Sequence, residues 1–170
     1  MDIERAIAPE VVVTVPYRGK TREDTYFITA STWEKRFLLQ SERMALLLVE
    51  TLLHYRRQRK YQLHEFVVMP NHFHLLITPM CPVTLEKAVQ FIKGGFSFRA
   101  RKESGALGEI WQTSFYDHRV RDSGEYERIR AYIHHNPVTK GLAASVDQYP
   151  YSSAAGFLLD EVPQRLKPVD

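Results

Sequence analysis

The chain contains 170 residues, of which 44% are hydrophobic and 25% are charged, and its formal net charge is +3 at pH 7. These values are typical of one folded domain and exclude a largely disordered chain, while the mild positive charge does not by itself identify a nucleic-acid-binding protein. The single cysteine, Cys81, excludes an internal disulfide framework, and no signal peptide or apolar membrane span is visible near the N-terminus. We therefore expect a cytoplasmic protein with no membrane partner.

Hydrophobic periodicity predicts seven elements. In chain order they are a strand, a helix, two strands, a helix, a strand and a helix, at residues 25–33, 41–60, 61–69, 72–78, 84–101, 115–121 and 125–135. The dipeptide Pro70-Asn71 predicts a hairpin turn, Gly94-Gly95 could kink the second helix, and Pro137 is expected to end or kink the last one. Residues 102–109 are polar and glycine-containing, which predicts a mobile loop.

This order of elements is that of the ferredoxin-like split βαβ fold, an α+β class. It predicts an antiparallel sheet with helices packed on one face and an added C-terminal helix, leaving the other face available for a site. We expect an N-terminal arm at residues 1–24 with one short strand at 11–15, a single domain at 25–156 and a C-terminal tail at 157–170.

Two histidines, His72 and His74, flank Phe73 in a predicted strand with apolar runs on both sides. Alternate residues of a strand point to the same face, so the two imidazoles would stand side by side with Phe73 on the opposite face. Paired imidazoles on a rigid strand are half of a metal site. Taken alone, the trio is a weak signal, because strand histidines are more often ordinary polar residues.

The last predicted helix contains Tyr132 and Asn136, four residues apart and therefore on one face. An amide oxygen is a hard ligand that suits Mg²⁺ or Mn²⁺. Two imidazoles and one amide oxygen leave coordination positions for water and a phosphate oxygen, and a tyrosine on the same helix face could attack that phosphate. Each residue also has a structural reading, since Tyr132 could pack on the helix face and the Asn136-Pro137 pair could simply stop the helix.

The chain resembles the single-tyrosine HUH transposases, and most closely the REP-associated tyrosine transposases of the IS200-like superfamily. The resemblance covers residues 25–153 and rests on three separated motifs in the same order: Val67-Val-Met-Pro-Asn-His-Phe-His-Leu-Leu-Ile77, Trp111-Gln with Phe115-Tyr-Asp-His118, and Tyr132-Ile-His-His-Asn-Pro-Val138. It implies that Tyr132 is the nucleophile, that His72 and His74 are metal ligands, and that Asn136 occupies the position of the third ligand.

The chemistry that this resemblance implies is metal-dependent cleavage and rejoining of single-stranded, hairpin-forming DNA through a 5′-phosphotyrosine intermediate, as in DNA transposition. The exchange of one phosphodiester for another needs no ATP. For contacts with DNA bases and phosphates, we expect a set of aromatic and basic side chains, namely Lys93, Arg99, Trp111, Tyr116, His118, Arg119, Arg121 and Arg128.

Two other functions are compatible with the sequence. The chain could be a non-catalytic nucleic-acid-binding module on the same fold, or a metal-dependent phosphoesterase that uses water in place of tyrosine. Whether the protein acts as a monomer or as a homodimer, and whether Tyr132 serves its own histidines or those of a second chain, are questions that the sequence leaves open.

Overall fold

The computed structural model describes residues 23–105 and 108–169. Nearly all of the expected N-terminal arm, including its short strand at 11–15, lies outside the described residues. Among the described helices, none is long and apolar enough to cross a membrane.

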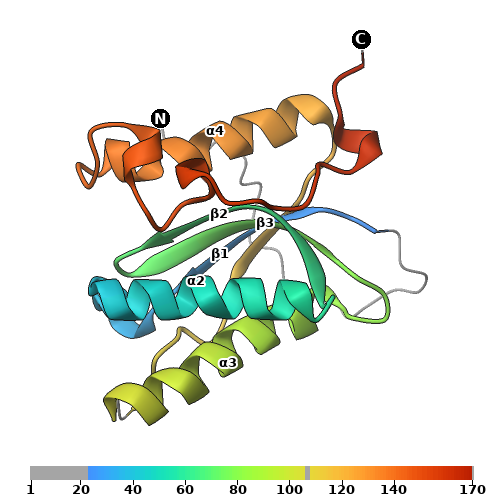
Figure 1. Ribbon diagram of the computed structural model, residues 1–170. Coiled ribbons are helices and arrows are strands. Elements are labelled where there is room, and N and C mark those ends of the chain that lie inside the picture. Colours follow the sequence, from blue (N-terminus) through green and yellow to red (C-terminus); the bar gives the residue numbers. More distant parts are fainter. Residues whose placement is uncertain (1–22, 106–107, 170) are drawn as a thin grey trace.

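Four strands form a single antiparallel sheet between two helical layers (Figure 1). They are β1 (Tyr26–Ser31), β2 (Tyr61–Met69), β3 (His72–Pro79) and β4 (Tyr116–Arg119), arranged in the order β2-β3-β1-β4. A strand that pairs with neighbours distant in sequence is what the split βαβ plan requires, so the predicted ferredoxin-like α+β fold is confirmed. The predicted hairpin between β2 and β3 is also present.

Helices α2 (Glu42–Arg57) and α3 (Leu85–Ser104) cover one face of the sheet. Ser41 caps α2 by accepting a bond from the Met44 amide. Helix α3 is continuous through the glycine pair, and Gly95 has a packing reason: a Cβ there would lie 2.6 Å from the Tyr55 ring. The two helices can therefore approach closely at this point.

The expected loop at 102–109 begins later than predicted. Helix α3 continues to Ser104 and ends at Gly105, whose left-handed backbone (φ 65°) suits a helix C-cap. The polar side chains of residues 102–104 are simply exposed on the last helical turn.

Helix α4 (Ser123–Thr139) lies on the opposite face of the sheet (Figure 1). The prediction that the helix ends at His135 was wrong. Pro137 withholds one amide hydrogen, but the carbonyls of Asn136 and Pro137 still accept bonds from Lys140 and Leu142, so the helical turn is completed. Asn136 is consequently a helix-interior residue whose direction is fixed by the backbone.

The sheet separates two hydrophobic clusters. Phe73, Leu75 and Ile77 of β3 face α2 and α3. Leu76 of the same strand faces α4, where it joins Phe27, Val67, Met69, Tyr126, Ile129 and Ile133. Alternation along β3 therefore places His72 and His74 on the α4 face.

The segment that follows α4 returns along the outer edge of β2. The Val68 amide donates to the Tyr151 carbonyl (2.8 Å), and the Asp160 amide donates to the Leu63 carbonyl (3.0 Å). Asp160 also accepts two bonds from Arg56 (2.8 and 3.1 Å). The segment thus satisfies part of an edge that would otherwise be open to pairing with another strand.

Candidate active site

The paired histidines stand as the strand period predicts. The ring centroids of His72 and His74 are 4.8 Å apart. His74 is buried and packs against Phe27 of the neighbouring strand β1 (5.4 Å between ring centroids), whereas His72, at the start of β3, is half-buried.

Each imidazole is oriented by a neighbouring side chain. Asn71 donates from its amide nitrogen to the Lys35 carbonyl (3.3 Å), which directs its Oδ1 toward His72, and the His72 Nδ1–H donates to that oxygen (2.6 Å). This hydrogen bond leaves the lone pair of His72 on Nε2. On β1, the Thr29 hydroxyl contacts Nδ1 of His74 at 2.8 Å. Such partners fix ring orientation in metal-binding histidines.

Both imidazoles are held in the neutral form that binds metals. Burial, with smaller contributions from the charges of Lys140 and Lys35, lowers the pKa of His72 to about 4. Burial and the neighbouring His72 lower the pKa of His74 well below its ordinary value.

Helix α4 brings the predicted nucleophile to the histidines of the same chain. The ring centroid of Tyr132 lies 5.2 Å from that of His74 and 6.1 Å from that of Phe27, and both ring pairs have edge-to-face geometry. One turn later, Asn136 is 4% exposed, and its Oδ1 atom has no hydrogen-bond partner among the described residues. A buried amide oxygen without a donor is costly in a folded protein unless it has another function.

The three side chains predicted as ligands are of types that can bind a divalent cation. They comprise two neutral imidazoles and the Asn136 oxygen, which is a ligand type that Mg²⁺ and Mn²⁺ accept. Within the described part of the chain, no three His, Cys, Asp or Glu side chains converge on a metal position, so any cation here would depend on the amide of Asn136 or on substrate oxygens.

The residues expected to contact DNA divide between the two faces of the sheet. Tyr116 and His118 pair with Thr29 and Phe27 and so lie on the α4 face, as part of the same surface as His74. His118 donates to Glu125 (2.6 Å), as does the backbone amide of Arg121 (2.7 Å), and these bonds tie the N-terminal turn of α4 to β4. On the same helix, the side chain of Arg128 is exposed.

Other members of this set are engaged elsewhere. Arg99 pairs with Glu50 (3.1 Å) and Arg119 with Asp24 (3.3 Å). Trp111 is buried between Phe73 and Phe96, which limits its use as a stacking platform. It borders a surface groove of about 670 Å³ beside α3, which is lined by Lys93, Gly94, Ser97, Phe98, Arg101, Lys102 and Trp111.

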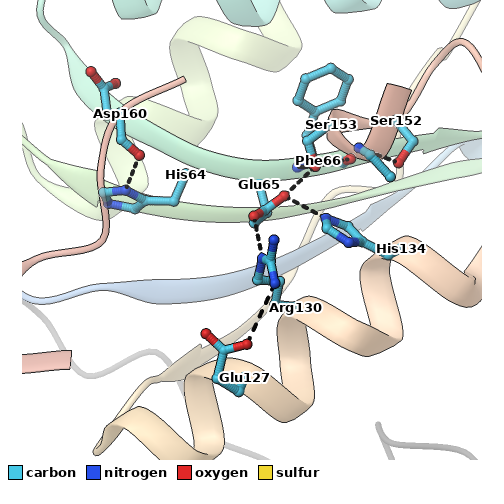
Figure 2. Close-up of polar contacts among 10 residues, drawn as sticks. His64, Glu65, Phe66, Glu127, Arg130, His134, Ser152, Ser153 and Asp160 are labelled. Atoms are coloured by element: carbon cyan, nitrogen blue, oxygen red, sulfur yellow. Dashed lines mark hydrogen bonds and ion pairs between the residues drawn. The ribbon is translucent and has the colours of Figure 1, made fainter. Parts of the chain in front are cut away.

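Sequence reasoning missed the residues that orient the site. Asn71 was assigned only to the turn, and Thr29 only to a strand. The buried carboxylate of Glu65 on β2, which contacts α4 (Figure 2), was also missed. One signal for Glu65 was present: Leu63 and Phe66 are core residues separated by two polar positions, which breaks the strand alternation and predicts a bulge.

Comparison with known proteins agrees with this fold. Residues 21–136 match the family model described as "Transposase IS200 like". A REP-associated tyrosine transposase of Escherichia coli K12 is 27% identical over 135 residues, covering 75% of this chain and 79% of its own. An uncharacterised protein of Haemophilus influenzae is 30% identical over 99 residues, covering 45% of this chain and 54% of its own.

A solved structure of a REP-associated tyrosine transposase bound to a REP hairpin has the same fold, with a TM-score of 0.68 and 22% identity. The match covers 93% of this chain and 99% of that one. Together, the fold and the comparisons define a class of protein, the DNA transposases of tyrosine type. Within that class, this chain belongs to the IS200-like transposase family, and the resemblance found in its motifs is confirmed.

Proposed function

We propose that the chain cleaves and rejoins single-stranded, hairpin-forming DNA with Tyr132 as the nucleophile. The observation that carries the proposal is the contact between Tyr132 and His74, whose rings are 5.2 Å apart within one chain. A phenol placed beside two neutral imidazoles, one of them buried, is suited to phosphotyrosine chemistry. Since nucleophile and histidines come from the same chain, the proposed site does not require a second copy.

The proposed cleavage exchanges one phosphodiester bond for another. The Tyr132 oxygen attacks the scissile phosphorus, forming a phosphotyrosine link to the 5′ end of the strand on the 3′ side of the break, while the bond from phosphorus to the 3′ oxygen breaks. The phenol loses its proton, the departing 3′ oxygen gains one, and a 3′-hydroxyl results. Attack by a 3′-hydroxyl on the link reverses these changes and rejoins a strand, so no external energy source is required.

His72, His74 and Asn136 would hold a Mg²⁺ or Mn²⁺ ion. When bound, such an ion supplies Lewis-acid stabilisation of the charge that develops on the phosphate oxygens. The chain's own contribution is to fix both imidazoles through Asn71 and Thr29 and to hold Tyr132 next to them. A tyrosine has an ordinary pKa of about 10 and is a poor nucleophile without such assistance.

The proposed substrate is single-stranded because a scissile phosphate within a stacked duplex could not easily reach a site between a sheet and a helix. The relative with the same fold was solved bound to a REP hairpin. We propose that Tyr116, His118 and Arg128, which lie on the α4 face or on α4 itself, are near the cleaved strand. Lys93, Arg101 and Lys102 of α3, which line the groove, are suited to the phosphates of a paired stem.

The test is covalent capture on a denaturing gel. The wild-type protein is incubated with a labelled single-stranded DNA containing a hairpin and with Mn²⁺, and is expected to form a protein–DNA adduct. Tyr132→Phe should abolish the adduct. Tyr126→Phe is the matched control: this tyrosine is on the same helix and buried, and its hydroxyl has no hydrogen-bond partner among the described residues, so its loss should leave the adduct unchanged.

Other outcomes identify the competing functions. Cleavage that yields free ends, without an adduct and without dependence on Tyr132, would indicate a phosphoesterase that uses water. Hairpin binding that persists after chelation and after substitution of His72, with no cleavage under any condition, would indicate a non-catalytic binding module.

A further inference from the structure

Glu65 is a charged residue in a mostly buried position on the edge strand β2, where it is 9% exposed. A bulge directs it toward α4. Leu63 pairs with Ile77 and Glu65 with Leu76, so His64 is an additional residue between them. Because of this additional residue, Glu65 lies on the α4 face, while Leu63 and Phe66 both lie in the cluster beneath α2 and α3.

The Glu65 carboxylate binds two side chains of α4 and one of the C-terminal segment (Figure 2). Arg130 Nε donates to Oε1 (2.9 Å), His134 Nε2 donates to Oε2 (2.7 Å), and the Ser153 hydroxyl also donates to Oε2. Burial alone would raise the pKa of Glu65, but these hydrogen bonds outweigh it and hold the pKa below its ordinary value. The carboxylate is therefore charged and saturated with donors, as a buried anion must be.

The two partners on α4 occupy the flank of the helix opposite to the proposed catalytic residues. Arg130 and His134 are four residues apart, as are Tyr132 and Asn136, and the two pairs are offset by two residues, or about 200° around the helix axis. Between the two flanks, the helix face toward the sheet presents Ile129 and Ile133. Apolar contacts of this kind are not directional, so they set which side of the helix faces the sheet but leave its exact rotation to directional bonds.

We propose that Glu65 is a positioning residue for the transposase site: by binding Arg130 and His134, it sets the rotation of α4 about its axis and hence the placement of Tyr132 and Asn136 beside His74. Hydrogen bonds are directional where apolar contacts are not. Figure 2 shows the Glu65 carboxylate between β2 and the flank of α4. The inference deepens the function proposed above and shares its nucleophile.

The primary test substitutes Glu65→Gln, which preserves shape but presents an amide to the donors on α4. Adduct formation with hairpin DNA and Mn²⁺ should slow about 10- to 100-fold, because a displacement of about 1 Å at a reacting group has effects of this size. The affinity for the DNA should change little, since Glu65 lies on the β2 side of α4. Amide hydrogen exchange in the second half of α4 should accelerate relative to that in β3.

A matched control separates positioning from general stability. Asp160→Asn removes another partly buried carboxylate beside β2, whose bonds among the described residues go to Arg56 and the Leu63 amide rather than to α4. This variant should lose thermal stability but retain the wild-type adduct rate at temperatures where it is folded. His134→Gln, which can still donate to Glu65, should recover most of the rate that His134→Leu loses.

Two results would overturn the proposal. One is a Glu65→Gln protein that forms the adduct at the wild-type rate while folded. The other is α4 exchange that is unchanged, or changed equally with β3. The exchange measurement needs no activity, so it decides the role of Glu65 even if the wild-type protein forms no adduct and the proposed function fails.

Discussion

The sharpest test of the site concerns Asn71, which touches neither the proposed nucleophile nor the proposed cation directly. The substitution Asn71→Ala removes the oxygen that accepts from His72 Nδ1 at 2.6 Å. It leaves the turn in place, because the Asn71 backbone carbonyl still accepts from the Thr32 amide (2.9 Å) and hydroxyl (3.1 Å). The substitution therefore removes two side-chain hydrogen bonds, the one that orients the His72 imidazole and the one that Asn71 donates to the Lys35 carbonyl.

The magnitude follows from the type of interaction removed. Loss of the hydrogen-bond partner of a metal-binding histidine typically lowers metal affinity or activity about 10- to 100-fold. That range corresponds to about 1.4–2.7 kcal/mol of binding free energy. The free energy of unfolding without metal should fall less, by about 0.5–1.5 kcal/mol, the usual net contribution of one hydrogen bond.

Isothermal titration of the metal-free protein with Mn²⁺ measures the binding free energy of the metal, and urea denaturation measures the free energy of unfolding. Asn71→Asp is the control, because it keeps an acceptor oxygen for His72 and loses only the amide that donates to the Lys35 carbonyl. It should retain most of the Mn²⁺ affinity. An Asn71→Ala protein that binds Mn²⁺ as tightly as the wild type would refute the idea that Asn71 orients a ligand.

Three further predictions concern stability and DNA binding. Gly94→Ala should raise the free energy of unfolding by about 0.5–1 kcal/mol, because alanine has the higher helix propensity. Gly95→Ala should lower it by about 1 kcal/mol through overpacking, because a Cβ at this position would lie 2.6 Å from the Tyr55 ring. Equal effects of the two substitutions in urea denaturation would contradict this packing. Burial tends to raise the pKa of Asp160, but the hydrogen bond from Arg56 outweighs burial, and the pKa is lowered. The stabilisation of the folded protein by the charged Asp160 carboxylate is therefore present above about pH 4 and disappears as the pH falls through the folded-state pKa. Asp160→Asn should flatten this part of the acid denaturation curve, and an unchanged curve would exclude the assignment. Lys102→Glu should weaken hairpin binding and reduce the slope of log affinity against log salt concentration by about 1. Adduct formation on a short unpaired strand should be unaffected. An equal loss of adduct formation on the hairpin and on the unpaired strand would place the groove in the active site.

The strand signals were sufficient to predict the sheet and the direction of the histidines. A period of two places His72 and His74 on the same face of β3, and hydrophobic periodicity gave the order of strands and helices that predicts the topology. The relation between Tyr132 and Asn136 was equally local, because a helix fixes it within one turn. These are the parts of the site that depend on spacing within a single element.

Features that depend on packing between elements could not be predicted in the same way. Trp111 was expected to be available for base stacking, but it fills the space between Phe73 and Phe96, because aromatic composition does not distinguish a surface platform from a core residue. The predicted helix end at His135 was wrong for a related reason. A proline does not end a helix when the carbonyls around it still accept hydrogen bonds from the next turn. Here the carbonyls of Asn136 and Pro137 accept from the amides of Lys140 and Leu142.

The bulge in β2 adds one residue to the strand without changing which face Leu63 and Phe66 occupy. The alternation of buried residues changes phase at His64, so that Leu63 before it and Phe66 after it point into the same cluster. A relative shorter by this one residue would keep Leu63 and Phe66 in the core and Glu65 toward α4, but it would lose the buried His64, whose Nε2 lies 2.8 Å from the Thr78 hydroxyl and whose Nδ1 lies 3.1 Å from the Asp160 carbonyl. The additional residue therefore connects β2 both to β3 and to the C-terminal segment that runs along its outer edge.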